Sequence, residues 1–188
     1  MKHDYRAIDA VVNIWTAEAL SHRPAWTDEF FVGKVKGKHD SRGISLEQML
    51  AGMDAAHIEY GFLVAAKSGR LGLPGCYHMP PEVVAAAVAR YPDRFFGLVG
   101  IDPYTGMDGV RALEYAVKEL GFIGAHIYPH WFELPANHAR YYPFYAKCIE
   151  LGIPVQMQVG QSLIYSKEQR CSSVGRPHSS WPMKLPMR

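Results

Sequence analysis

The alternation of two apolar patterns along the 188-residue chain places the strongest constraint on its fold. Five short apolar runs, rich in Val, Ile and Phe, are nearly continuous, as expected of strands buried on both faces of a parallel sheet. These runs are Ile8–Asn13, Gly61–Ala66, Phe95–Ile101, Phe122–Ile127 and Pro154–Val159. Helical patterns lie between the runs, so the chain repeats strand and helix. This order predicts an α/β fold with a parallel sheet and right-handed crossovers.

The expected helices carry their own boundary signals. Ser45 and Gln48 form a capping box in front of a helical pattern of apolar residues. Pro81 suits the first turn of the next helix, and Gly121 is a stop signal after the third. The last expected helix opens at Pro143 and ends at Gly152.

The spacing of the strands predicts one long insertion. Strand starts near residues 8, 61, 95, 122 and 154 leave steps of 34, 27 and 32 residues after the second strand, each close to one βα unit. The first step is 53 residues, so the first loop holds an insertion of about 20. It carries aromatic residues and the basic residues Lys34, Lys36, Lys38 and Arg42. Two interpretations of the insertion remain: a solvated loop, or a lid over the strand ends.

Two architectures fit five strands. One is a partial (βα)8 TIM barrel with about five βα units, and the other is a complete five-stranded doubly wound parallel sheet. Periodicity does not separate them. We assign residues 1–160 to the barrel portion. Residues 161–188 are polar and hold three prolines, so we expect an irregular C-terminal tail that is the truncated start of the next βα unit.

Composition excludes several classes of protein. A net charge of +2 gives no basic surface for nucleic acid, and no apolar run approaches the ~20 residues of a membrane span. Cys76, Cys148 and Cys171 are odd in number and widely spaced, which argues against a disulfide framework. We expect a cytoplasmic protein that acts on a small molecule. We also expect a homo-oligomer, because five barrel strands leave two open edges.

Polar residues at the strand ends indicate a site, because chemistry in parallel α/β folds lies at the carboxyl ends of the strands. The densest group is "GAHIYPHWFELPANHARYY", in which His126 and Tyr128 would share one face of a strand. His126 and His130 are the candidate catalytic residues, and also the candidate metal ligands, although no spacing proves ligation. The other reading is that they are hydrogen-bonded histidines packed among aromatic rings. Candidate substrate-binding residues are Asn13, Trp15, Arg70, Tyr128 and Gln158.

Several segments together resemble the amidohydrolase-2 family, which includes the aminocarboxymuconate-semialdehyde decarboxylase-like enzymes. They are "IDAVVNIWT", "YPDRFFGLVGIDP", "LEYAVKELGFIGAHIYP", "YYPFYAKCIELGIPVQMQVG" and "SVGRP". The resemblance implies a TIM barrel and a metal-dependent hydrolase or decarboxylase. It also implies a divalent metal, Zn or Mn, held by an HxH pair on the first strand and a histidine after the fifth. Those places hold Val11, Asn13 and Gln158 here, so the ligand motif does not carry over.

We therefore expect an amidohydrolase-related hydrolase or decarboxylase that acts on a small carboxylated or cyclic substrate, with an atypical metal site. His126 would be the base, and Arg70 or Lys67 would hold the substrate carboxylate. The alternative is an inactive or truncated relative that acts as a binding or interaction protein. A flavodoxin-like nucleotide-binding domain is disfavoured, because the chain has no phosphate-binding loop.

Overall fold

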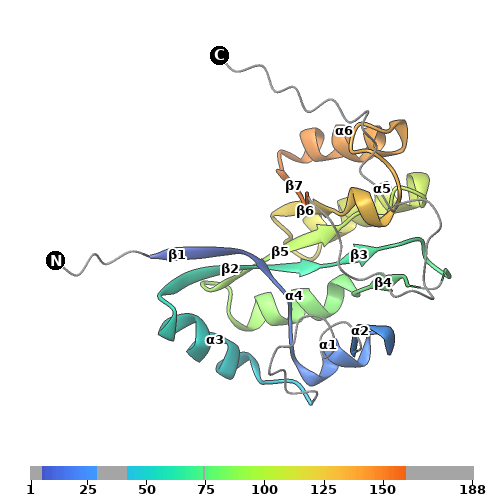
Figure 1. The fold of residues 1–188 in the computed structure, drawn as a ribbon. Helices are drawn as coiled ribbons and strands as arrows, with labels where there is room; N and C mark the ends of the chain where they lie inside the picture. Colours follow the sequence, from blue (N-terminus) through green and yellow to red (C-terminus); the bar gives the residue numbers. More distant parts are fainter. Residues whose placement is uncertain (1–5, 29–41, 74, 160–188) are drawn as a thin grey trace.

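A five-stranded parallel sheet curls into half of a barrel in the computed structural model, which describes residues 6–28, 42–73 and 75–159 (Figure 1). The strands are β1 (Ala7–Val12), β2 (Ile58–Ala65), β5 (Phe95–Gly100), β6 (Gly124–Ile127) and β7 (Val155–Met157). They pair in chain order, β1-β2-β5-β6-β7, and every pairing is parallel. This order confirms the α/β prediction. It excludes the doubly wound alternative, whose strand order reverses within the sheet.

Four helices cover one face of the sheet: α3 (Leu46–Ala55), α4 (Pro81–Arg90), α5 (Gly106–Lys118) and α6 (Tyr142–Leu151). In Figure 1, α3 and α4 lie below β2 and β5, and α5 and α6 lie beside β6 and β7. The Ser45–Gln48 capping box is formed, and Gly152 ends α6 in the left-handed conformation, both as predicted. The last helix begins at Tyr142 instead of Pro143, so the proline occupies its second position.

Short elements complete the described part. Helix α1 (Ala17–Ser21) precedes the expected insertion, which covers residues 22–43, and α2 (Trp26–Asp28) lies within it. Two 3-10 helices follow β6, η2 (Pro129–Trp131) and η3 (Ala139–Tyr141). Residues 29–41 of the possible lid and the expected tail at 161–188 lie outside the described residues.

The two faces of the sheet have different environments. The convex face packs against the helices through a large apolar cluster that includes Leu63, Phe95, Ile127, Leu113 and Phe144. The concave face carries a smaller cluster of Val64, Ala66 and Leu98, against which Phe62, Tyr77 and Tyr128 pack. Helices on one face only are the arrangement of a barrel wall, whose concave face becomes the interior.

The first strand departs from the prediction. We expected strands buried on both faces, but Ile8 and Val11 are 55% and 49% exposed. The reason is that β1 is an edge strand of the described sheet, with β2 as its only neighbour there. Strand β2 also begins at Ile58, three residues before the predicted start.

A hairpin replaces the flexible loop expected after the second strand. Strands β3 (Lys67–Ser68) and β4 (Tyr77–His78) pair in antiparallel fashion, and the chain turns between them. The turn from β2 into β3 passes directly over Gly100, because a Cβ there would lie 2.4 Å from the Ala65 carbonyl oxygen. Only glycine leaves room for this crossing. The hairpin therefore lies at the carboxyl ends of the strands.

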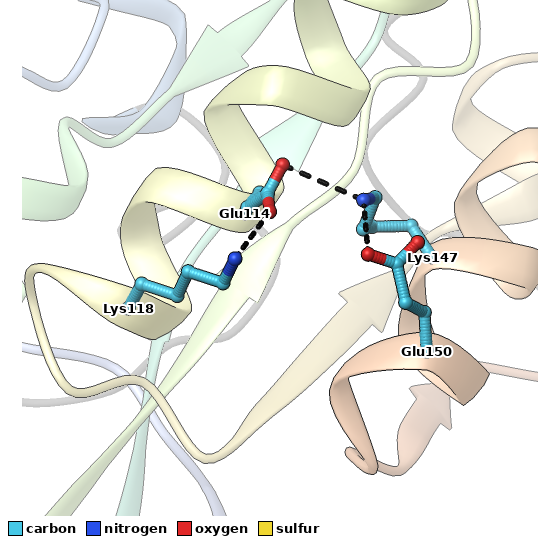
Figure 2. A network of polar contacts seen from close by, with 4 residues as sticks. All are labelled: Glu114, Lys118, Lys147 and Glu150. Atoms are coloured by element: carbon cyan, nitrogen blue, oxygen red, sulfur yellow. Dashed lines mark hydrogen bonds and ion pairs between the residues drawn. The ribbon is translucent and has the colours of Figure 1, made fainter.

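An ion-pair network joins the last two helices (Figure 2). Glu114 accepts from Lys118 at 2.6 Å and lies 3.4 Å from the ammonium of Lys147, which also reaches Glu150 at 2.8 Å. Lys147 is half-buried, whereas Lys118 and Glu150 are exposed, so each pair with an exposed partner adds little stability.

No described helix is long and apolar enough to cross a membrane. The cytoplasmic location and the homo-oligomer remain predictions.

Candidate functional site

His126 lies in the interior of the half-barrel, near the carboxyl ends of the strands. It stands in β6 between Gly100 of β5 and Gln156 of β7, and it is 1% exposed. Its ring lies 4.3 Å from the Tyr128 ring, which confirms that the two residues share one strand face. Because Tyr128 packs against the concave cluster, both rings lie on the barrel-interior side.

The hydrogen bonds of Gln156 define the protonation of His126. Gln156 Nε2 donates to the Ala10 carbonyl at 2.8 Å, and a carbonyl can only accept, so the orientation of this amide is determined. The other amide atom, Oε1, lies 2.6 Å from His126 Nδ1 and must accept from it. His126 Nδ1 therefore carries the proton, and Nε2 presents a lone pair.

This lone pair is available for chemistry. His126 Nε2 is buried and has no hydrogen-bond partner among the described residues. Burial lowers the pKa of His126, and the hydrogen bond to Gln156 opposes this shift. A neutral imidazole with a fixed tautomer and a free Nε2 can take a proton or bind a cation.

The second histidine lies along a row of aromatic rings. His130, in η2, is half-buried, its Nε2 has no hydrogen-bond partner in the described part of the chain, and burial lowers its pKa. Its ring lies 6.5 Å from Tyr128 and 6.2 Å from Trp131, and Trp131 lies 5.9 Å from Trp26. Burial raises the pKa of Tyr128 to about 12, so its hydroxyl stays protonated between the two histidines. Flat apolar faces of this kind suit a ring-shaped ligand.

The other predicted residues are divided among three places. Trp15 is half-buried, with the guanidinium of Arg23 4.2 Å from its ring centre. Asn13 and Gln158 are exposed just beyond β1 and β7. Arg70 is exposed in the β3–β4 hairpin, with its guanidinium 4.4 Å from the Tyr104 ring centre. Ring contacts join His126 to Tyr128 and Tyr128 to His130.

Sequence analysis selected Gln158 of the last strand as a site residue, whereas Gln156 is the glutamine that reaches His126. The two-residue period of a strand places Gln156 and Gln158 on one face, so it points to both glutamines and does not choose between them. Arg23, which lies near both Trp15 and Tyr77, was also not predicted from the sequence. His138, the third histidine of the segment after β6, caps the start of η3, where its Nδ1 accepts from the Arg140 N–H at 3.2 Å.

A second polar group lies at the ends of β2 and β5. Asp102 is 2% exposed, and its Oδ2 is 3.9 Å from His78 Nε2. Burial lowers the pKa of both His78 and Lys67, and the Asp102 carboxylate opposes each shift. By contrast, a cleft lined by Ile14, Glu47 and Arg90 involves none of the predicted site residues.

Comparisons with known proteins agree with this architecture. The sequence pattern of the amidohydrolase family (Amidohydro_2) matches residues 8–187. The 5-carboxyvanillate decarboxylase of Novosphingobium aromaticivorans, solved with bound manganese and a nitrobenzoic acid, aligns at a TM-score of 0.63 and 20% identity. The alignment covers 84% of this chain and 52% of that one. At this identity it shows the fold alone.

Hydratases are also similar. The 4-oxalomesaconate hydratase of Rhodopseudomonas palustris aligns at a TM-score of 0.52 and 24% identity, over 81% of this chain and 52% of that one. The 2-keto-4-carboxy-3-hexenedioate hydratase of Sphingobium sp. (strain NBRC 103272 / SYK-6) is 32% identical over 89 residues, which are 43% of this chain and 26% of the hydratase. The chain thus spans about half the length of the solved structures and less of the curated relative.

The manganese held by that decarboxylase raises the question of a metal here. In residues 6–28, 42–73 and 75–159, no three His, Cys, Asp or Glu side chains gather as a metal site requires. The first-strand positions hold Val11 and Asn13, which leaves the free Nε2 of His126 without the partner ligands that a metal ion needs. The described residues therefore do not fit the manganese that this decarboxylase holds. Fold and sequence pattern nevertheless agree over nearly the whole chain, which belongs to the amidohydrolase family.

Proposed function

We propose that this chain acts as a hydrolase or decarboxylase on a small carboxylated ring compound, with His126 as the general base. The observation that carries the proposal is the buried Nε2 of His126, which is unprotonated because Gln156 fixes the proton on Nδ1. A base must be neutral at the working pH, and the lowered pKa of His126 keeps it so.

The role of His126 is the same in either reaction. It takes a proton from a water or from a substrate hydroxyl onto Nε2. It returns that proton to the departing group in hydrolysis, or to the carbon that loses CO2 in decarboxylation. His130 would assist from the far side of Tyr128, with which its ring is in contact.

The surroundings of His126 support a ring-shaped acid as the substrate. The rings of Tyr128 and Trp131 offer flat faces, and Asn13, Trp15 and Gln158 would line the open side. Arg70 supplies the charge for a carboxylate. The decarboxylases and hydratases that share the fold are named for small carboxylic acids, which supports the same substrate class.

The test compares wild-type protein with His126→Gln on a panel of small aromatic carboxylates, with CO2 release and hydrolysis as readouts. We expect turnover to fall about 10²- to 10⁴-fold, the usual contribution of a general base. The matched control is His57→Asn, an exposed histidine at the amino end of β2 whose left-handed backbone asparagine tolerates. A His126→Gln enzyme that is folded and as active as wild type would refute the proposal.

The alternative is a binding protein without catalysis. It is favoured by one observation, the Val11 and Asn13 that occupy the expected ligand positions. It predicts that wild-type protein binds members of the panel and turns none of them over. The divalent metal implied by the family resemblance remains a separate prediction, measured by metal analysis of the purified chain.

A further inference from the structure

Tyr104 forms a fixed platform beside the proposed site. Its backbone N–H donates to Asp102 Oδ1 at 2.8 Å, and its hydroxyl donates to the Phe132 carbonyl at 3.1 Å. The first bond holds the residue to the end of β5, and the second holds its ring to the segment after η2. Two anchors at opposite ends leave the ring little freedom.

Two guanidinium groups lie against this one ring. Arg70 reaches it from the β3–β4 hairpin, at 4.4 Å from the ring centre, and Arg140 reaches it from η3, at 4.8 Å. Segments that follow β2, β5 and β6 therefore each contribute one part. All three lie at the carboxyl ends of the strands, on the same edge as His126 and His130.

The two positive charges lack a negative partner in the described part of the chain. Arg6, Arg90, Arg94 and Arg111 each form an ion pair with a carboxylate. For Arg70 and Arg140, the contact found in that part is the Tyr104 ring. The nearby carboxylate of Asp102 is buried, and one of its oxygens already accepts from the Tyr104 N–H. Bringing two cations to one ring costs Coulomb energy, which an anion placed between them would recover.

We propose that Arg70 and Arg140 bind a carboxylate of the substrate that is not the reacting group, so that the substrate carries at least two acid groups. The inference rests on the proposed function, since it places this subsite in the same mouth. An ion pair to the carboxylate that leaves as CO2 would stabilise the ground state and slow its loss. The subsite is therefore proposed for the decarboxylase reaction, in which the carboxylate held by both arginines is a second one. Planar guanidiniums suit a planar carboxylate better than a lysine would.

The test measures the binding of benzoate and isophthalate (benzene-1,3-dicarboxylate) to the full chain by calorimetry. We expect wild-type protein to bind isophthalate at least about tenfold more tightly than benzoate, since charge-assisted hydrogen bonds are the strong ones. Arg70→Gln and Arg140→Gln should each remove this preference. Arg140→Lys, which keeps the charge and loses the planar fork, should retain only part of it. Arg111→Gln is the control, because Arg111 is exposed on α5 and pairs with Asp108.

Three outcomes would overturn the assignment. The first is equal affinity of wild-type protein for the two acids, and the second is a preference that survives in the double variant Arg70→Gln with Arg140→Gln. The third is inorganic phosphate bound as tightly as isophthalate through the same two arginines. The last outcome would make the subsite one for phosphate. His126→Gln should bind isophthalate as wild type does, so a failure of the proposed base leaves this result readable. Equal affinity for the two acids in a wild-type protein that does turn over the aromatic carboxylates would count against the subsite alone.

Discussion

Replacing Gln156 by alanine directly tests the two hydrogen bonds through which this glutamine links His126 to Ala10. The substitution removes the acceptor for His126 Nδ1–H and the donor to the Ala10 carbonyl. Ala10 is exposed, so its carbonyl finds water at little cost. His126 is 1% exposed, so its N–H is left unpaired in the interior. A buried donor without a partner costs about 1–3 kcal/mol, which is therefore the expected loss in the free energy of unfolding.

The assay is urea unfolding at pH 8, where histidine is neutral in both states. Gln158→Ala is the matched control, because this glutamine is exposed two residues further along the same strand. Its substitution should change the free energy of unfolding by less than about 0.5 kcal/mol. The double variant His126→Phe with Gln156→Leu should recover much of the loss, because both polar groups are gone.

Nitrogen NMR of the imidazole supplies an independent readout. In the wild type, Nδ1 should carry the proton and Nε2 should be bare, whereas in Gln156→Ala the preference should weaken. Two results would refute the reasoning: a Gln156→Ala protein as stable as Gln158→Ala, or a wild-type His126 protonated on Nε2.

Two further predictions concern stability. Gly100→Ala should cost about 3 kcal/mol or more, because the new methyl would lie 2.4 Å from the Ala65 carbonyl oxygen. Gly52→Ala, in α3 with open space around it, should instead stabilise the protein by about 0.5–1 kcal/mol. Similar urea midpoints for the two variants would contradict the close passage of the β2–β3 turn over Gly100. The free energy of unfolding should also fall as pH drops from about 7 to 5, because the unfolded chain takes up protons near pH 6.5 while burial holds the pKa values of His126, His130 and His78 below that. Thermal unfolding across this pH range measures the effect. The variant His126→Phe should show a smaller loss of stability on acidification. Stability that is constant or rises on acidification would show that these histidines protonate freely in the folded protein.

Much of the fold could be predicted from the chain because its signals are local. Apolar runs, a capping box and helix-ending glycines each act within a few residues, and they placed all five parallel strands and the four main helices. The exposure of β1 could not be predicted, since it depends on which strands are neighbours. The hairpin β3–β4 was missed because two residues a side carry no periodicity. Likewise, nothing in the sequence marks Gly100 as the point where another segment crosses.

In the candidate site, too, the local relations could be predicted from the sequence and the contacts between distant segments could not. The shared face of His126 and Tyr128 follows from the two-residue period of a strand. The choice of Gln156 over Gln158 depends on how far β7 is shifted against β6, which a single chain does not encode locally. Arg140 joins Arg70 on Tyr104 only after three loops fold toward one edge. Such contacts depend on how the strands are ordered in the sheet and not on any local pattern in the sequence.

The row of rings that ends in Trp131 and Trp26 has an optical consequence. Indoles 5.9 Å apart couple electronically and give a near-ultraviolet circular dichroism signal that depends on their mutual geometry. His130 lies 6.2 Å from Trp131 on the other side, and a protonated imidazole quenches the emission of a neighbouring indole. The mouth of the half-barrel therefore contains its own reporter. Ligand entry and the titration of His130 can both be followed by the light these tryptophans absorb and emit, without any label.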